Sequence, residues 1–328
     1  MTEFVANCSM PLAIIFLAAG FFFLVKGADI FVDGSSSIAK KFHVPSIIIG
    51  LTIVAMGTSL PEAAVSVTAS LANQNTLAVS NVVGSNIFNL MVVIGMCAVL
   101  TPVAVQRETL KRDFPFSVFC AILLLILGWM GPMQLGHGDG VIFLVLFAIF
   151  IGCMIRSALK ANKEGKTAEG DSSEIDEMKI MSLPKSLLFI VMGAAGIILG
   201  GDVVVNSATN MATRLGMSET LVGLTIVSIG TSLPELVTSV VAARKHEVDM
   251  ALGNAIGSNI FNILMVLGIA GAISPMAFLT ENIIDIVILL VFSLIVWFFA
   301  WTKQKLNRGE GAIMLALYAA FMVYICMR

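Results

Sequence analysis

The chain has 328 residues, of which 58% are apolar and only 12% are charged, and its formal net charge is -2. This composition excludes an ordinary soluble domain, which is about 45–50% apolar and about 25% charged. No basic patch with interleaved aromatic residues is present, so the sequence offers no nucleic-acid surface. The five cysteines are far apart and form no CxxC pair, which excludes a zinc site, a redox pair and a disulfide framework.

Long apolar runs recur along the chain, and a run of about 18 or more residues can span a bilayer as a helix. The N-terminus lacks a basic region and a small-residue cleavage site, so we expect the first run to be retained as a span. The pattern predicts an all-α polytopic membrane protein with ten transmembrane helices, over residues 10–32, 46–72, 76–100, 114–131, 139–158, 184–208, 219–243, 249–272, 283–302 and 310–327.

One long polar segment, residues 160–183, separates a first unit of residues 1–159 from a second unit of residues 184–328. Its charged sequence is typical of a linker. With these ten spans, 16 of the 19 lysines and arginines fall on the side of this linker and only two fall on the other side. Because positive loops stay in the cytoplasm, the linker is predicted to be cytoplasmic and both termini non-cytoplasmic.

The two units share a repeat at one constant sequence offset, which aligns Gly50 with Gly223. Gly50–Glu62 (GLTIVAMGTSLPE) and Gly223–Glu235 (GLTIVSIGTSLPE) are identical at 11 of 13 positions, and the same offset aligns the GSNIFN of Gly84–Asn89 with that of Gly257–Asn262. Each unit then holds five spans, an odd number, so the second unit enters the membrane in the opposite sense. Such inverted repeats place their substrate sites near the midplane, at the repeat interface.

Each GTSLPE copy places a helix breaker and a carboxylate within an apolar span. Pro61 and Pro234 cannot donate an N–H to the preceding turn, so we expect each helix to end and restart there. Glu62 and Glu235 then lie in the first turn of the new half-helix, where the helix dipole stabilises an ionised carboxylate. The motif therefore predicts broken helices in spans 2 and 7, each with a charge at membrane depth.

Further oxygen donors surround these breaks. The hydroxyl residues before each proline are candidate N-caps, and the break frees backbone carbonyls just upstream. In GSNIFN the glycine permits a gentler break in spans 3 and 8, the serine can cap it, and the last asparagine lies one turn further on. A set of oxygen donors without histidine or cysteine suits a hard cation such as Ca²⁺ or Na⁺. The candidate cation ligands are Glu62, Glu235, Thr58, Thr231, Ser59, Ser232, Ser85, Ser258, Asn89, Asn262 and the backbone carbonyls of Ala55 and Ser228.

Structural explanations compete for some of these features. A lone proline in a membrane helix is usually a kink, and a lone serine or asparagine usually joins helices. Two copies in an inverted repeat, each with a costly intramembrane glutamate, favour a functional site. Asp29 and Asp202 have the same offset, but we assign them structural roles, with Lys26 as a partner of Asp29. Close helix packing accounts for Gly50, Gly95, Gly223 and Gly268.

The paired motifs resemble the α-repeats of the cation/Ca²⁺ exchanger superfamily, most closely those of the YrbG-like prokaryotic Na⁺/Ca²⁺ antiporters. The resemblance extends over the whole ten-span plan. It implies that Glu62 and Glu235 are shared ligands of Ca²⁺ and Na⁺, helped by Thr58 and Thr231. The flanking Na⁺ sites that it implies are formed by Ser59, Ser85, Ser232, Ser258 and the carbonyls of Ala55 and Ser228.

One departure concerns the central positions of that family, which match Asn89 and Asn262. Many relatives carry an aspartate at one of them, whereas this chain has asparagine at both. A possible third carboxylate is therefore missing. The two remaining glutamates balance one Ca²⁺ or two Na⁺, so the same site could serve either ion in turn.

The resulting hypothesis is a secondary active antiporter, not an enzyme, in which Na⁺ influx drives Ca²⁺ efflux by alternating access. Ca²⁺ and Na⁺ are its substrates, no cofactor is indicated, and the family points to a bacterial inner membrane. By analogy, we expect spans 1 and 6 to move against the broken-helix core. Three other functions stay open: a cation/H⁺ antiporter that uses the same glutamates, a passive cation channel, and a membrane scaffold or sensor. GTSLPE favours Na⁺ coupling, because the proton-coupled branch typically has a different motif.

Overall fold

Helices form almost all of the chain in this computed structural model, which describes residues 5, 8–71, 76–129, 133–164, 180–217 and 228–327. The first unit contains α2 (Met10–Lys41), α3 (Ser46–Ile49), η1 (Gly50–Val54), α4 (Ala55–Thr58), α5 (Leu60–Leu71), α6 (Thr76–Phe88), η2 (Asn89–Val93), α7 (Ile94–Leu100), β1 (Val103–Ala104), η3 (Thr109–Asp113), α8 (Phe114–Trp129), β2 (Gln134–Leu135) and α9 (His137–Glu164). The second contains α10 (Leu183–Arg214), α12 (Ser228–Thr231), α13 (Leu233–Arg244), α14 (Val248–Phe261), η5 (Asn262–Val266), α15 (Leu267–Ile273), β3 (Met276–Ala277), α16 (Thr280–Lys303), β4 (Lys305–Leu306) and α17 (Arg308–Met327). The prediction of a predominantly helical protein is confirmed.

Seven helices of the described chain are long and apolar enough to cross a membrane, and the bent pair α3–α5 makes an eighth candidate. The two other predicted spans, residues 114–131 and 219–243, are not among these candidates. In the first, α8 is 16 residues long. The beginning of residues 219–243 lies outside the described residues, as do residues 165–179 of the predicted linker.

The helix that carries the first GTSLPE copy is bent by 45° between Thr58 and Leu60, as the proline predicts. In the second copy α12 and α13 are likewise separated at Ser232. Proline within a helix removes a backbone hydrogen bond and clashes with the preceding turn, so the axis changes direction there. The predicted interruption of spans 2 and 7 is therefore present in the described part of both.

The helices that carry GSNIFN are continuous at their glycines, which corrects the prediction of broken helices in spans 3 and 8. In each, a single π-helical turn begins at Asn89 or at Asn262 and joins two α-helical parts. A π turn fits an extra residue into a continuous helix. Glycine costs a helix only about 1 kcal/mol relative to alanine, which the packing of a buried helix can offset. The irregularity therefore begins at the last asparagine of each GSNIFN motif rather than at its glycine.

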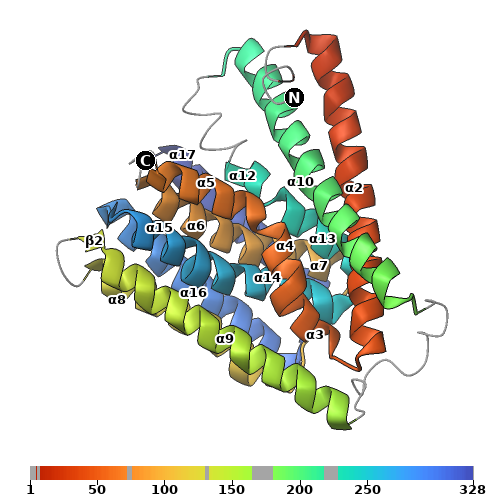
Figure 1. The fold of residues 1–328 in the computed structure, drawn as a ribbon. Coiled ribbons are helices and arrows are strands. Elements are labelled where there is room, and N and C mark those ends of the chain that lie inside the picture. The colour runs from red at the N-terminus through yellow and green to blue at the C-terminus, as the bar shows by residue number, and fades with distance from the viewer. Residues whose placement is uncertain are drawn as a thin grey trace.

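The two longest helices, α2 and α10, pack along each other at one side of the bundle (Figure 1). Their backbones approach closely at glycines. A Cβ atom on Gly27 would lie 2.7 Å from Ile197 N, and one on Gly193 would lie 2.6 Å from Phe31 N. Small residues at such crossings allow van der Waals contact between membrane helices. These helices are the first spans of the two units.

The remaining helices of the two units interleave rather than pack as separate halves. A Cβ atom on Gly50 would lie 2.5 Å from Met250 O, and one on Gly253 would lie 2.6 Å from Ile47 O. This confirms that Gly50 serves close packing. Two antiparallel strand pairs also join the units, with β1 paired to β4 and β2 paired to β3. The core around the GTSLPE and GSNIFN motifs is therefore shared by both units.

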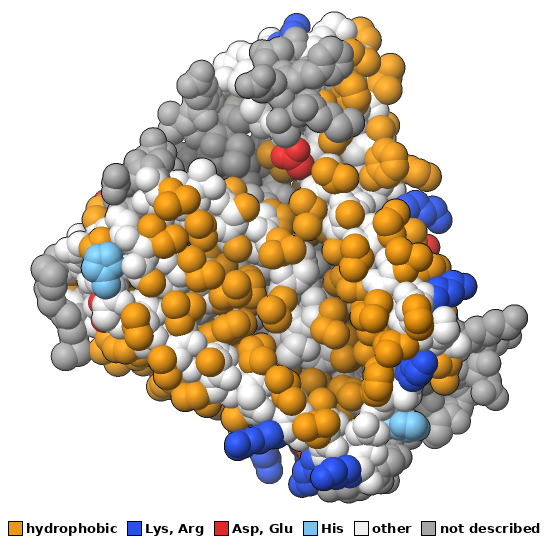
Figure 2. Space-filling view, in the orientation of Figure 1, with side chains coloured by type: hydrophobic (Ala, Val, Ile, Leu, Met, Phe, Trp, Pro, Cys, Tyr) orange, Lys and Arg blue, Asp and Glu red, His pale blue; other side chains and the backbone are white. Residues whose placement is uncertain are grey.

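Hydrophobic side chains cover most of the molecular face in Figure 2, and the lysines and arginines visible there gather mainly along its lower and right edges. Large apolar side chains such as Phe22, Ile149 and Phe298 are more than half exposed. A soluble protein rarely presents so much contiguous apolar surface, whereas a bilayer accepts it. The described surface agrees with a protein that is embedded in lipid.

Candidate cation-binding site

Glu62 and Glu235 are fully buried, and each is hydrogen-bonded to the opposite unit. Ser59 Oγ donates to Glu235 Oε1 over 2.7 Å, and Ser232 Oγ donates to Glu62 Oε1 over 3.1 Å. A hydrogen bond to an ionised carboxylate is about twice as strong as one between neutral groups. The two GTSLPE copies thus build one site, to which each unit contributes one carboxylate and one serine hydroxyl.

The local helix geometry places these carboxylates. Glu62 lies in the first turn of α5 and Glu235 in the first turn of α13, just after the break. First-turn N–H groups have no partner within the helix, and together with the helix dipole they favour negative charge. The sequence prediction for the two glutamates therefore matches the position of each residue.

The side-chain cap expected from Ser232 is not formed. Ser232 occupies the N-cap position of α13 but makes no side-chain cap hydrogen bond. Its hydroxyl and that of Ser59 instead donate to the glutamate of the other unit. A hydroxyl has one donor hydrogen, and in both serines it is directed to the carboxyl group of the opposite unit. This reciprocity was not visible in either motif alone.

The expectation of a free backbone carbonyl upstream of the break is contradicted at Ala55 and untested at Ser228. The Ala55 carbonyl is not free, because Ser59 N donates to it over 3.0 Å. In the second copy Ser232 N donates to Ile229 O over 3.1 Å, and the side chain of Ser228 lies outside the described part of the chain. The hydroxyl of Thr58 also lies 3.4 Å from Ala55 O, so this carbonyl has two hydrogen-bonding neighbours within its own unit.

Both threonines of the motif are buried. Thr58 Oγ1 lies 3.1 Å from Val54 O in its own helix and 3.1 Å from Asn254 Oδ1 in the other unit. Thr231 is 8% exposed. Thr58 therefore links the helix break in the first unit to α14 of the second unit.

Asn254 is a site residue that the sequence analysis missed. Its Nδ2 donates to Ser239 Oγ over 2.9 Å and to Glu235 O over 3.3 Å, while its Oδ1 faces Thr58. The repeat offset held a signal, because Asn81 stands at the equivalent position of the first unit and donates to Ser66 Oγ over 3.3 Å. Each asparagine thus holds the helix turn that follows a glutamate.

A second reciprocal contact joins the GSNIFN motifs. Asn86 Nδ2 donates to Asn259 O and Asn259 Nδ2 donates to Asn86 O, both over 3.1 Å. Asn262 Nδ2 in turn donates to Asn86 Oδ1 over 3.2 Å. These amides fix the crossing of the two helices beside the glutamates. The sequence analysis quoted Asn86 and Asn259 within the motif but gave them no role.

Six of the predicted ligand atoms are buried without a hydrogen-bond partner in the described structure. Two are carboxylate oxygens, two are amide oxygens and two are serine hydroxyls. A buried polar atom without a partner costs about 1–3 kcal/mol, so six such atoms from the same two motifs require an explanation. They are Glu62 Oε2, Glu235 Oε2, Asn89 Oδ1, Asn262 Oδ1, Ser85 Oγ and Ser258 Oγ.

The chemistry of this set fits a hard cation. Every atom is an oxygen, two of the six carry charge, and Ca²⁺ takes six to eight oxygen ligands. Within the described residues, no group of three or more histidine, cysteine, aspartate or glutamate side chains forms a cluster for a metal of another type. The site offers two carboxyl groups and neutral oxygens at the contact between the units.

Comparison with known proteins identifies the family. The sodium/calcium exchanger protein family matches residues 12–156 and 185–327. The chain belongs to the sodium/calcium exchanger family. The two matched segments correspond to the two units, and the unmatched residues between them include the whole predicted linker.

Two curated relatives of this exchanger family extend over nearly the whole chain. Inner membrane protein YrbG of Escherichia coli is 34% identical over 97% of this chain and 97% of its own length. Sodium/calcium exchanger MaX1 of Methanosarcina acetivorans is 32% identical over 94% of this chain and 97% of its own length. The resemblance inferred from the motifs is thereby confirmed.

A solved structure of the sodium-calcium exchanger NCX_Mj, soaked with Na⁺ and Ca²⁺, has the same fold as the present chain. The TM-score is 0.79 with 32% sequence identity, and the match covers 95% of this chain and 98% of that chain. The fold is therefore that of a known cation exchanger along almost its full length.

Proposed function

We propose that this protein is a secondary active antiporter that exchanges Na⁺ for Ca²⁺ across the membrane at the Glu62–Glu235 site. The observation that carries the proposal is the reciprocal pair of hydrogen bonds between the units, Ser59 to Glu235 and Ser232 to Glu62. It makes one site from two broken helices, as transport by a repeat fold requires. The relatives named as sodium/calcium exchangers support the choice of ions.

In this proposal the two carboxylates are the ligands common to Ca²⁺ and Na⁺. One Ca²⁺ or two Na⁺ neutralise them, so occupancy by one ion excludes the other. The orphaned oxygens of Asn89, Asn262 and the two GSNIFN serines complete the site. Thr58, Thr231 and the carbonyls of Ala55 and Ser228 line its flanks. If more than two Na⁺ enter for each Ca²⁺, transport carries net charge.

The proposal includes the architecture of two inverted five-helix repeats, residues 1–159 and 184–328, around a linker at 160–183. Equivalent contacts across the units support it. Val105 N donates to Gln304 O over 2.9 Å, and Phe278 N, at the position equivalent to Val105 in the second unit, donates to Met133 O over 2.8 Å. A pseudo-twofold relation between the units explains such pairs, and an odd number of spans in each unit inverts the second.

The membrane orientation follows from the positive-inside rule. It places the linker in the cytoplasm and both termini outside it. The relative named as inner membrane protein YrbG supports a bacterial inner membrane. The bilayer is then the main partner of the exposed apolar surface. Alternating access would require α2 and α10, which pack together by close glycine contacts, to move as a pair against the shared core.

The decisive experiment measures uptake of radiolabelled Ca²⁺ into Na⁺-loaded proteoliposomes, with external Na⁺, K⁺ and pH varied in turn. We expect uptake to require internal Na⁺ and to fall when external Na⁺ is added. Uptake driven by a pH gradient without Na⁺ would instead indicate a cation/H⁺ antiporter. Flux without any counter-ion would indicate a channel, and Ca²⁺ binding without flux would indicate a sensor.

A further inference from the structure

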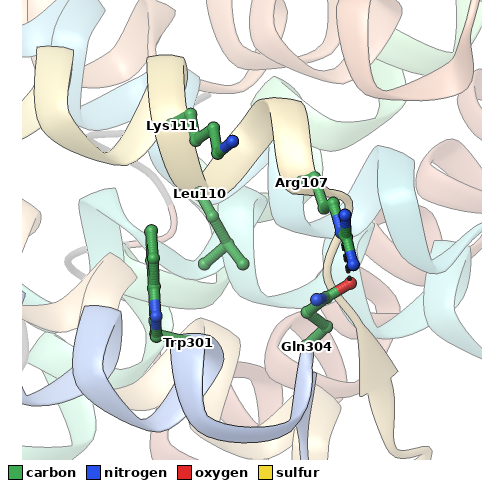
Figure 3. Close-up of a pocket in the computed structure, with 5 residues that line it drawn as sticks. All are labelled: Arg107, Leu110, Lys111, Trp301 and Gln304. Atoms are coloured by element: carbon green, nitrogen blue, oxygen red, sulfur yellow. Dashed lines mark hydrogen bonds between the residues drawn. The ribbon is translucent and has the colours of Figure 1, made fainter.

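A basic pocket lies away from the cation site, between the segment that leads into α8 and the end of α16 (Figure 3). It has a volume of about 240 Å³ and is lined by Arg107, Leu110, Lys111, Trp301 and Gln304. We call this cavity the basic pocket. None of its lining residues is acidic, so it presents positive charge on one side and an aromatic surface on the other.

The two cations of the basic pocket stand one helical turn apart on the same face. Arg107 and Lys111 are both exposed, and Arg107 Nε donates to Gln304 Oε1 over 3.4 Å. No carboxylate among the described residues pairs with either cation. Figure 3 shows both side chains on the helical segment that faces Trp301 and Gln304. The pocket therefore offers two unneutralised donors to an anion.

The opposite wall carries Trp301, whose ring continues an exposed apolar stripe. Trp301 is 54% exposed and packs edge-to-face on Trp297, whose indole N–H donates to Leu110 O over 2.9 Å. Trp301 is also the last member of an exposed stripe on α16, which comprises Val287, Val291, Leu294, Phe298 and Trp301. Their spacing of three and four residues puts them on one helix face. An apolar track thus runs along α16 up to the two cations.

The fold does not require this chemistry. The turn at Gln304 has its equivalent at Met133. Both residues have positive φ, and their carbonyls accept equivalent backbone hydrogen bonds, Gln304 from Val105 and Met133 from Phe278. In the second unit, however, the positions equivalent to Arg107 and Lys111 are occupied by Thr280 and Ile284. The second unit therefore repeats the turn without the two cations, so the pocket has a property that packing alone does not explain.

We propose that the basic pocket binds the phosphate headgroup of one anionic phospholipid, with an acyl chain along the α16 stripe. Arginine and lysine bind phosphate oxygens, and tryptophan favours the headgroup level of a bilayer. Anionic lipids give the cytoplasmic leaflet its negative surface potential, and the lysine and arginine distribution assigns the loops of the pocket to the cytoplasmic side. The apolar track selects a lipid over a soluble phosphate. The inference does not depend on which ions the central site exchanges.

The test compares phosphatidylglycerol with phosphatidylcholine of the same acyl chains, by native mass spectrometry and lipid titration of the full-length protein. We expect the wild type to prefer phosphatidylglycerol. The double variant Arg107→Gln/Lys111→Gln should weaken phosphatidylglycerol binding about 30-fold, at about fivefold for each cation, and leave phosphatidylcholine within about twofold. Should the double variant not fold, Lys111→Gln alone should weaken it about fivefold.

The matched control is Arg156→Gln/Lys163→Gln, which removes two exposed cations from α9, outside the basic pocket. We expect no change in lipid preference. An equal loss in this control would show a general effect of surface charge and overturn the proposal. Displacement of phosphatidylglycerol by inorganic phosphate or glycerol phosphate would show that the pocket takes soluble phosphates, and would overturn the lipid assignment. A wild type without headgroup preference would overturn it as well.

Discussion

The buried cation site and the outer contact of α2 with α13 follow different rules of symmetry. At the site, the serine–glutamate and Asn86–Asn259 contacts are each repeated in the other unit. The bond from Asn262 Nδ2 to Asn86 Oδ1 is not repeated, because Asn89 Nδ2 and Asn259 Oδ1 have no partner in the described structure. At the outer contact, Lys245 Nζ lies 2.6 Å from Asp29 Oδ1 and 2.6 Å from Asp33 Oδ1. The equivalent acidic residue, Asp202, accepts instead from Asn206 Nδ2 of its own helix over 3.0 Å.

In the proposed exchanger, this difference would separate ion binding from the control of access. A symmetric site gives the ions the same ligands whichever unit opens, because both units contribute equally. A one-sided ion pair between α2 and α13 stabilises only one arrangement of the two helices. We therefore expect changes at the site to alter exchange from both faces, and changes at Lys245 to alter the balance between faces.

The largest effect is expected from Glu62→Gln or Glu235→Gln. Either change removes half of the charge that balances Ca²⁺, and loss of one buried charge partner costs about 3–5 kcal/mol, or about 100-fold or more. Na⁺-driven Ca²⁺ uptake into proteoliposomes should fall to background in both variants. Because the site is symmetric, the two losses should be alike.

Glu247→Gln is the matched control for these variants. Glu247 is a buried carboxylate of the same core and accepts a hydrogen bond from Ser46 over 2.8 Å, but it lies outside the two motifs. Its replacement should leave exchange largely intact. Full exchange in Glu62→Gln and Glu235→Gln would contradict the assignment of the site.

The sequence predicted the glutamates because their chemistry is local to the motif. Pro61 and Glu62 need only one helix turn to define a break and a first-turn carboxylate. The bonds from Ser59 and Ser232 could not be predicted in the same way, since they depend on how the units cross. That crossing is set by Gly50 against α14, a contact between residues of different units that lie far apart in the sequence.

The π turns at Asn89 and Asn262 were also beyond prediction. The GSNIFN sequence has a glycine that suggests a break, and local propensity does not distinguish a break from a widened turn. Asn254, by contrast, was within reach. Asn81 is its equivalent at the same repeat offset, and an intramembrane amide repeated at that offset indicates a shared role.

The second prediction tests the symmetry of the neutral ligands. Asn89→Ala and Asn262→Ala each remove one orphaned amide oxygen and no charge, and Asn262→Ala also removes the bond to Asn86 Oδ1. Loss of one such partner costs about 1–1.5 kcal/mol, so the KM for Ca²⁺ should rise about 10-fold in each variant. Kinetics of Ca²⁺ uptake at several Ca²⁺ concentrations measure this. A large loss in one variant with none in the other would show that the two units do not share the site equally.

The third prediction concerns the asymmetric contact. Lys245→Gln removes the cation that joins α13 to Asp29 and Asp33. All three side chains are partly exposed, so solvent screening limits the effect to about 1 kcal/mol, or about fivefold in the balance between the two access states. The KM for Ca²⁺ measured from the two membrane faces should therefore shift in opposite directions.

Asp202→Asn is the control for Lys245→Gln, because its carboxylate is bonded only within α10 in the described structure and does not join α10 to the core. Hydrogen exchange of the α2 backbone should increase in Lys245→Gln and stay unchanged in Asp202→Asn. An equal increase in both would show that the acidic residues act through helix stability rather than through the contact with α13.

The smallest effect is expected from Lys26→Gln. Lys26 and Lys245 both form ion pairs with Asp29. Lys26 Nζ lies 3.8 Å from Asp29 Oδ2, and the two side chains are 59% and 38% exposed. Both residues are on α2, so their ion pair connects no moving parts, and exposed pairs of this kind contribute about 0–1 kcal/mol. Exchange should stay within about twofold of wild type, with the same KM at both faces. A shift as large as that of Lys245→Gln would mean that charge near Asp29, and not the connection between α2 and α13, sets the balance between the access states.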